Sequence, residues 1–295
     1  MIKRSKFISG KKREKLFSDF CIMPGFAGVL AFYFIPFCIV IYYSLVNNPV
    51  MHEFVGLDNF RALLKNNAFL TAAKNTAVFS VTAVPLSLIL SLGLAVMLEK
   101  NIPGKSLFRT FFLSPLMVPT ASVVLVWQVL FHNHGTINQI IELLGGQPVD
   151  WLKSAHGQIV IVCMFLWKNL GYNMILFISA LCAIPGDILE VAELEGTGAF
   201  YKFFHIKLRY LSPTLLFVMI LSLINSFKIF REVYLLTGDY PYDKLYMLQH
   251  FMNNTFNSLD YQKLSSAAVV FAAVMIVIIA VLMLIENKYG KDVEC

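Results

Sequence analysis

Long apolar runs separated by short polar segments dominate the sequence. A helix needs about 20 apolar residues to cross a hydrocarbon layer about 30 Å thick. The pattern therefore predicts six transmembrane helices, at residues 20–46, 76–98, 110–131, 157–183, 214–236 and 265–285. The first run carries no charge and is too long for the apolar part of a signal peptide, so we expect it to be a retained helix. These runs indicate an all-α, polytopic membrane protein.

The fifth run is the least regular of the six. Only residues 214–227 are free of charge, and Lys228, Arg231 and Glu232 follow within the same predicted helix. Such a short apolar stretch does not span a membrane by itself. These charged side chains are therefore expected to face water, a cavity or a partner. A chain with five spans would instead have its termini on opposite sides of the membrane.

The composition agrees with a chain solvated mainly by lipid. Of the 295 residues, 58% are hydrophobic and only 14% are charged, whereas globular proteins carry about 25% charged residues. The mean hydropathy is +0.68. So few charges cannot cover a water-soluble fold of this size, which excludes a soluble enzyme and a disordered tail.

The basic residues predict the orientation of the helices. The formal net charge is +6, and seven Lys and Arg residues lie within the first fifteen positions. With the N-terminus inside, fifteen basic residues fall in cytoplasmic segments and six in external loops. Because cytoplasmic loops carry the excess of positive charge, both termini are predicted to be cytoplasmic, at residues 1–19 and 286–295. Membrane retention explains the basic N-terminus, so no nucleic-acid partner is predicted.

The sequence shows no pattern for catalysis, cofactor binding or metal binding. The five cysteines form no C-x-x-C pair, and four of them lie inside apolar runs. That arrangement favours buried thiols over a disulfide framework or a zinc site. Gly104-Lys105-Ser106 matches the end of a phosphate-binding loop, but Glu99 stands where the first glycine is required. We therefore expect no bound cofactor and no enzymatic activity in this chain.

Residues 184–213, between the fourth and fifth runs, are predicted to form a helix–glycine–helix hairpin. An acidic helical segment ends at Gly196 and Gly198, and an amphipathic segment follows over residues 199–206. One interpretation is an interfacial hairpin that packs on the helix bundle. The other is a lever that docks into a groove of a soluble partner.

The hairpin resembles the EAA loop of ABC-importer permeases. Glu190-Val191-Ala192 stands for Glu-Ala-Ala, Gly196 follows at the matching distance, and Ile206 and Leu208 complete the pattern. Val191, Glu195 and Arg209 depart from it. The resemblance implies an ATPase-coupling loop within a five-helix permease core at residues 76–285. Its coupling residues would be Glu190, Val191, Ala192, Glu195, Gly196, Ile206 and Leu208.

Further segments in the same order resemble the maltose and glycerol-phosphate type of permease. These segments are residues 108–110, 135–138, 150–152, 167–173 and 226–238. The resemblance implies a type I ABC importer permease fold in a bacterial inner membrane, forming half of the pathway for a sugar or a polyol phosphate. It implies as partners a second permease, two ATPase subunits that hold ATP and Mg²⁺, and an extracellular substrate-binding protein.

Polar groups in the fourth and fifth runs are candidates for contact with substrate. Sugar recognition needs hydrogen-bonding groups beside aromatic faces, and the candidates are Trp167, Asn169, Gly171, Asn173, Asn225, Ser226 and Lys228. Interhelical hydrogen bonds, each worth about 0.6 kcal/mol, are the alternative for the neutral groups.

The charged groups of the same runs have alternatives of their own. Lys168 is expected to form a structural ion pair. Lys228 and Glu232, spaced i,i+4, are expected to pair with each other. Arg231 is then left for an anionic substrate or for a carboxylate of a partner.

Two other classes of membrane protein compete with the importer interpretation. A secondary transporter or channel would work without an ATPase, but it would need an ion-coupling site. Glu232 is the one acidic residue within the predicted spans, and it lies near an end. An intramembrane enzyme would need a catalytic pair such as Ser–His or two Asp, and the spans contain neither His nor Asp.

Overall fold

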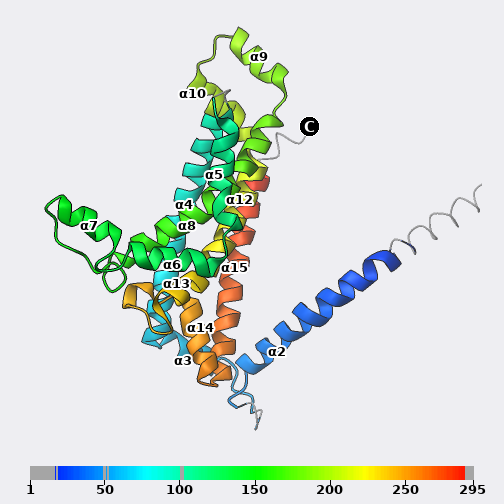
Figure 1. The fold of residues 1–295 in the computed structure, drawn as a ribbon. Coiled ribbons are helices and arrows are strands. Elements are labelled where there is room, and N and C mark those ends of the chain that lie inside the picture. Colours follow the sequence, from blue (N-terminus) through cyan, green and yellow to red (C-terminus); the bar gives the residue numbers. More distant parts are fainter. Residues whose placement is uncertain (1–16, 18, 49–50, 52, 100–102, 290–295) are drawn as a thin grey trace, which may run out of the picture. The chain divides into compact units, whose positions relative to one another are not determined.

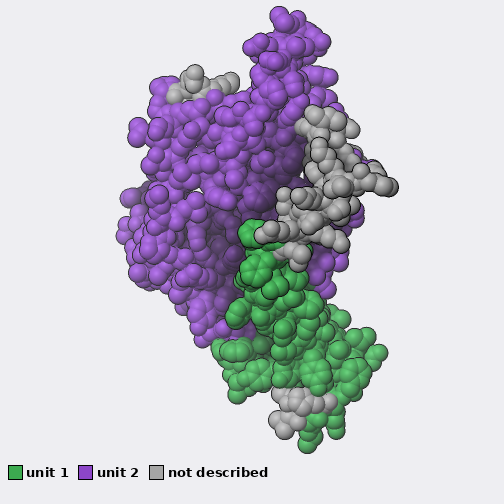
Figure 2. Space-filling model, turned by 90° about the vertical axis from the view of Figure 1, so that its right-hand side faces the viewer, with its two compact units in different colours: residues 1–65, 255–272 green, residues 66–254, 273–295 purple. Residues whose placement is uncertain are grey.

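The computed structural model describes residues 17, 19–48, 51, 53–99 and 103–289. The predicted basic segment at residues 1–19 lies almost wholly outside these described residues, as do residues 290–295 of the predicted C-terminal segment. Within the described ranges the chain is helical, with one isolated β-bridge between Val46 and Phe54. The chain divides into two compact units, residues 1–65 with 255–272 and residues 66–254 with 273–295 (Figure 2).

The first unit contains the first apolar helix, Asp19–Ser44. Its π-helical turn η1 (Leu30–Phe34) leads directly into α2 (Ile35–Ser44). Pro36 stands at the start of α2 and lacks the N–H that a regular α-helix would use there. Helix α3 (Asp58–Leu64) returns toward the end of α2, where the Asn59 amide donates hydrogen bonds to the carbonyls of Ser44 (3.0 Å) and Val46 (2.8 Å). The bond to Ser44 satisfies one of the carbonyls that the end of α2 leaves unpaired, and the bond to Val46 holds the segment that follows the helix.

The second unit holds most of the helices, and Figure 1 shows their order. In chain order they are α4 (Asn67–Glu99), α5 (Lys105–Met117), α6 (Thr120–Leu130), α7 (Thr136–Leu143), α8 (Gly157–Cys182), α9 (Gly186–Leu194), α10 (Ala199–Tyr201), η2 (Lys202–Lys207), α11 (Leu208–Tyr210), α12 (Ser212–Lys228), α13 (Phe230–Thr237) and η3 (Asp243–Leu245). Helices α14 (Leu248–Asn257) and α15 (Tyr261–Tyr289) contribute residues to both units.

Helices α4, α8 and α12 pack side by side and form the core of the second unit (Figure 1). Their shared cluster includes Val84, Phe177 and Val218, all fully or almost fully buried. Other large side chains of α4, such as Val81 and Ile89, remain exposed. An apolar outer surface of this kind is typical of helices that face lipid or a partner.

The described residues contain five single helices that are long and apolar enough to cross a membrane, and one bent pair of helices. These six elements correspond to the six predicted runs. Helix α4 begins earlier than predicted because the side chain of Asn66 accepts a hydrogen bond from the Phe69 N–H (3.1 Å), which caps the helix start. The fifth span continues through its charged residues, as α12 followed by α13.

The third predicted span is not the single helix expected over residues 110–131. It is divided into α5 and α6, which meet at an angle of 100°. The break lies at Val118, which is extended (φ −85°, ψ 128°) immediately before Pro119. A proline disfavours helical backbone in the residue before it, so the helix ends at this point. The prediction of one continuous helix was therefore wrong.

Candidate functional site

The hairpin of residues 184–213 stands at one end of the helix bundle, with α9 projecting beyond α5 and α12 (Figure 1). Helix α9 ends in a Schellman motif: the Thr197 N–H donates to the Ala192 carbonyl (3.1 Å) and the Gly196 N–H to the Glu193 carbonyl (3.0 Å). Gly196 has φ +73°, a conformation that favours glycine. The predicted break of the hairpin is therefore built by Gly196, whereas Gly198 has an ordinary φ of −68°.

Ion pairs hold the two arms of the hairpin. The Lys202 ammonium lies 2.7 Å from the Glu193 carboxylate, and Lys207 contacts both carboxylate oxygens of Glu99 on α4, at 2.7 and 2.6 Å. The hydrogen bond from Lys202, together with its positive charge, lowers the pKa of Glu193. Lys202 therefore ties the second arm of the hairpin, α10 with η2, to α9, and Lys207 ties the same arm to the end of α4.

The outer face of the hairpin carries exposed apolar side chains. Leu194 is 88% exposed and Phe200 is 78% exposed, and Val191 is also open to the surroundings. Ala192 turns inward and is buried. Of the other predicted coupling residues, Glu190, Glu195 and Gly196 are exposed, and Ile206 and Leu208 are half-buried. The arrangement presents an unpartnered apolar ridge edged by acidic groups.

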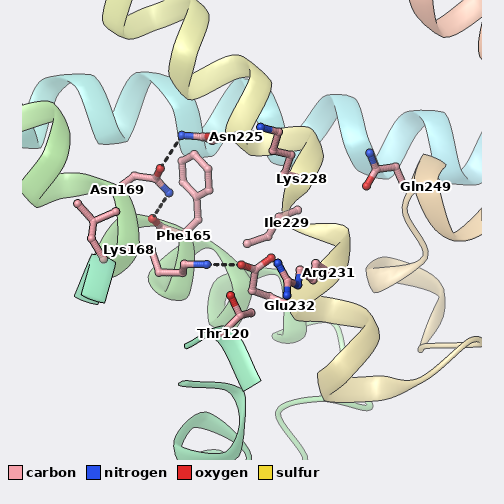
Figure 3. A pocket seen from close by; sticks show the side chains of 11 residues that line it. Thr120, Phe165, Lys168, Asn169, Asn225, Lys228, Ile229, Arg231, Glu232 and Gln249 are labelled. Atoms are coloured by element: carbon pink, nitrogen blue, oxygen red, sulfur yellow. Dashed lines mark hydrogen bonds and ion pairs between the residues drawn. The ribbon is translucent and has the colours of Figure 1, made fainter. Parts of the chain in front are cut away.

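A second candidate site is a cavity of about 440 Å³ in the second unit (Figure 3). It lies where the α5–α6 break faces α8, α12 and α13. The lining residues are Leu116, Thr120, Phe165, Lys168, Asn169, Asn225, Lys228, Ile229, Arg231, Glu232 and Gln249. Pro119 thus has a structural consequence, because the break that it causes brings Thr120 to the cavity wall.

Three polar contacts order the cavity wall. The Lys168 ammonium is paired with the Glu232 carboxylate, as the dashed line in Figure 3 marks. The Asn225 side-chain amide donates to the Asn169 carbonyl oxygen (3.0 Å), and the Asn169 amide donates to the backbone carbonyl of Phe165 (2.8 Å). Both side-chain amides are therefore held in fixed orientations beside the cavity.

Three of the predicted substrate-pathway residues line this cavity: Asn169, Asn225 and Lys228. The other four do not. Trp167 packs against the ring of Trp127, with centroids 6.4 Å apart. Asn173 is buried and donates to the hydroxyls of Ser87 and Ser222, both at 3.0 Å.

Ser226 and Gly171 also lie between helices. The Ser226 hydroxyl is 2.9 Å from that of Ser80. A Cβ atom added at Gly171 would lie 1.8 Å from the Phe112 carbonyl oxygen, so this glycine allows α5 to cross α8 at close range. In this structure both residues, like Asn173, serve helix packing, the alternative that the sequence left open.

The prediction that Glu232 pairs with Lys228 was wrong. Glu232 is buried and pairs with Lys168, whereas Lys228 is exposed at the cavity. The i,i+4 rule assumes one continuous helix, but α12 ends at Lys228 and α13 begins at Phe230. Sequence reasoning also missed Thr120 and Gln249 as lining residues, and no local pattern marks either of them.

The comparisons with known proteins agree with this architecture. Residues 83–293 match the family model described as "Binding-protein-dependent transport system inner membrane component". The chain is 29% identical to the trehalose/maltose transport system permease protein MalF of Thermococcus litoralis, covering 96% of this chain and 97% of that one. It is 28% identical to the sn-glycerol-3-phosphate transport system permease protein UgpA of Agrobacterium fabrum, covering 90% and 92%.

Solved structures show the same fold. A bacterial ABC transporter involved in the import of the acidic polysaccharide alginate contains a chain that superposes with a TM-score of 0.79 at 19% identity. The match covers 98% of this chain and 100% of that one. Because the family model spans most of the sequence, and both the apolar helices and the fold agree with it, the chain belongs to the family of binding-protein-dependent transport system inner membrane components and is a multi-pass permease of an ABC importer.

Proposed function

We propose that this chain forms half of the translocation pathway of an importer for a sugar or a polyol phosphate. Its partners would be a second permease, two ATPase subunits that hold ATP and Mg²⁺, and an extracellular substrate-binding protein. The two relatives are named for trehalose and maltose and for sn-glycerol-3-phosphate, which supports this substrate class. The proposed location is the inner membrane of a bacterial cell, with both termini in the cytoplasm.

The observation that carries the coupling role is the exposed apolar ridge of α9 and α10. Leu194 and Phe200 project from a hairpin whose turn is fixed by Gly196 and whose second arm is tied to α4 by Lys207. Large exposed apolar side chains on a rigid projection are typical of a surface that binds another protein. In this proposal an ATPase subunit receives the ridge, and its movement reaches α4 through the Lys207–Glu99 pair.

ATP hydrolysis would then drive transport by differential binding. The closed and open ATPase pairs would hold the hairpin in two positions, and the helix bundle would follow. No chemical step on this chain is needed. The rival class, a secondary transporter or channel without an ATPase, gains no support from the names of these relatives.

A matched pair of glycine substitutions tests the coupling role. Gly196→Ala places a side chain at φ +73°, whereas Gly198→Ala places one at φ −68°, and both sites have open space around the new Cβ. We expect Gly196→Ala to reduce the amount of ATPase that purifies with this chain and to reduce ATP-dependent uptake. The left-handed backbone conformation costs a residue with a Cβ about 1–2 kcal/mol, so the substitution destabilises the turn of the hairpin. Gly198→Ala should leave both unchanged.

Glu190→Lys provides an independent second variant, because it alters the charge of the exposed hairpin surface without changing the turn. ATPase association and uptake that survive both Gly196→Ala and Glu190→Lys would refute the coupling role.

A further inference from the structure

The cavity of Figure 3 carries an excess of positive charge. Four charged side chains line it, and the Lys168–Glu232 pair neutralises two of them. Lys228 and Arg231 form no ion pair with any described residue. The cavity therefore presents two uncompensated cations.

We propose that the substrate carries an acidic group, a carboxylate, phosphate or sulfonate, and that Lys228 and Arg231 hold this group as it passes the cavity. The inference rests on the proposed function, because it assigns a chemical class to the cargo of that importer. Charge-assisted hydrogen bonds from ammonium and guanidinium groups to such oxyanions are shorter and stronger than neutral ones. Arg231 supplies a planar fork and Lys228 a compact point charge.

The position of Lys228 within its span supports a role that needs its charge. Lys228 lies nine residues before the end of the apolar span Ser212–Thr237. At 1.5 Å per helical residue this places Lys228 about 13.5 Å along the helix from its end. Charged residues within apolar spans usually face a cavity or a substrate pathway, and Lys228 faces the cavity of Figure 3.

The neutral groups of the cavity suit the rest of a carbohydrate. The side chains of Thr120 and Gln249 have no hydrogen-bond partner among the described residues, and both line the cavity. The amides of Asn169 and Asn225 also line the cavity and are held in fixed orientations by their hydrogen bonds. The cavity of about 440 Å³ lies within the usual size range of small-molecule sites. One cavity therefore offers both neutral groups for sugar hydroxyls and cations for an acidic group.

A carboxylate of the partner permease could also neutralise Lys228 and Arg231, because both side chains are exposed. That arrangement would seal the cations within a subunit interface. The two arrangements differ in whether a small charged reagent reaches the cavity of the assembled complex, and this difference is measurable without knowledge of the substrate.

The first experiment measures the electrostatics of the cavity in the assembled complex. Thr120→Cys is introduced into a chain in which the five natural cysteines are replaced by serine. The reaction rates with anionic sulfonatoethyl and cationic trimethylammonioethyl methanethiosulfonate are then compared. We expect the anionic reagent to react faster than the cationic one. The double substitution Lys228→Gln with Arg231→Gln should lower the ratio of the anionic to the cationic reaction rate about tenfold or more. Lys244→Gln, outside the cavity, is the matched control and should leave the ratio unchanged.

Two results of this experiment would overturn the inference. One is a rate ratio that the double substitution does not alter. The other is a combination of two observations: neither reagent modifies the introduced Cys in the complex, and the double substitution releases the partner permease. That combination would place Lys228 and Arg231 in the subunit interface.

The second experiment identifies the acidic group. ATP-dependent uptake into proteoliposomes that contain the complex and its binding protein is measured with glycerol 3-phosphate, a glucuronate disaccharide, a 6-sulfonated glucoside and neutral maltose. We expect uptake of one of the anions, reduced about tenfold or more by the double substitution, since each lost charged hydrogen bond alone accounts for a factor of this order. The Lys244→Gln control should transport normally.

The outcomes separate this inference from the proposed function. Two results would overturn the anionic substrate class and leave the proposed importer function standing. One is uptake of maltose alone. The other is uptake of none of the three anions by a complex whose ATP hydrolysis still responds to its binding protein. A purified chain without an ATPase, which transports without ATP, overturns both.

Discussion

The ammonium of Lys168 on α8 is paired with the carboxylate of Glu232 on α13, between residues 64 positions apart in the chain. The Glu232 side chain is 7% exposed and that of Lys168 is 21% exposed. A buried charge is tolerated when an opposite charge compensates it. The pair therefore fixes α13 against α8 and explains how two charged residues are accommodated within apolar spans.

Replacing Glu232 by Gln is expected to destabilise the fold by about 3 kcal/mol, because it leaves the Lys168 charge without its partner in a low-dielectric environment. The measurement is the free energy of unfolding of the purified chain in mild detergent, followed by tryptophan fluorescence. The double variant Lys168→Met with Glu232→Met should recover most of the loss, since it removes both charges together.

Lys228→Gln is the matched control for this prediction. Because Lys228 is exposed and pairs with no described residue, its loss should change the unfolding free energy by less than about 0.5 kcal/mol. A cost as large as that of Glu232→Gln would mean that the i,i+4 pair with Glu232 forms after all.

Gly171→Ala is expected to disrupt the crossing of α5 and α8. The added Cβ would lie 1.8 Å from the Phe112 carbonyl oxygen, and a backbone atom cannot move aside as a flexible side chain would. We expect a loss of about 3 kcal/mol or more in unfolding free energy. The same substitution at Gly93 on α4, where nothing lies within 4 Å, should stabilise the helix by about 0.5–1 kcal/mol. Equal effects at the two sites would contradict the close approach.

The sequence predicted the features that depend on local interactions. The pattern of apolar runs located the five single helices and the bent pair that are long and apolar enough to cross a membrane, because each helix satisfies its own backbone. The hairpin was predictable for the same reason, since Gly196 determines the turn without help from distant residues. The break at Val118 has a local signal too, in Pro119, but many membrane helices tolerate proline. Helix α4, for example, continues through Pro85.

The cavity was not predictable from local patterns. Asn169 and Asn173 lie one turn apart on the same face of α8, so a helical pattern treats them alike. In the structure, Ser87 of α4 and Ser222 of α12 close over Asn173, while Asn169 remains at the cavity wall. The pairing of Glu232 with Lys168 instead of Lys228 was not predictable for the same reason, because it depends on where α13 packs against α8.

The two asparagine environments predict different phenotypes. Asn173→Ala removes two buried interhelical hydrogen bonds and should lower the unfolding free energy by about 1–2 kcal/mol. The uptake that each folded complex supports should remain normal. Asn225→Ala, at the cavity, should change stability little and raise the KM for uptake severalfold. Uptake and unfolding measured on the same preparations test this division, and the reverse assignment of the two effects would refute it.

His250 on α14 is expected to make stability depend on pH. Its ring is fully buried, and the Phe230 ring stands edge-on with centroids 4.7 Å apart. The Met247 N–H donates to Nδ1 (3.2 Å), so Nδ1 carries no proton, and Nε2 is buried without a partner in the described chain. Burial lowers the pKa of His250 to about 4 from an ordinary value of 6.5.

The sign of this dependence follows from proton binding. Between pH 6.5 and about 4 the unfolded chain holds a proton on His250 that the folded chain does not, so the unfolding free energy falls as the pH is lowered, by roughly 3 kcal/mol over this window. Unfolding measured from pH 7 to pH 4 should show this decline, and His250→Gln should remove that part of it. His156→Gln, at an exposed histidine, is the control and should retain the full decline. If His250→Gln leaves the pH dependence of the unfolding free energy unaltered, other groups cause the decline. His250 would then bind its proton equally well in the folded and the unfolded chain.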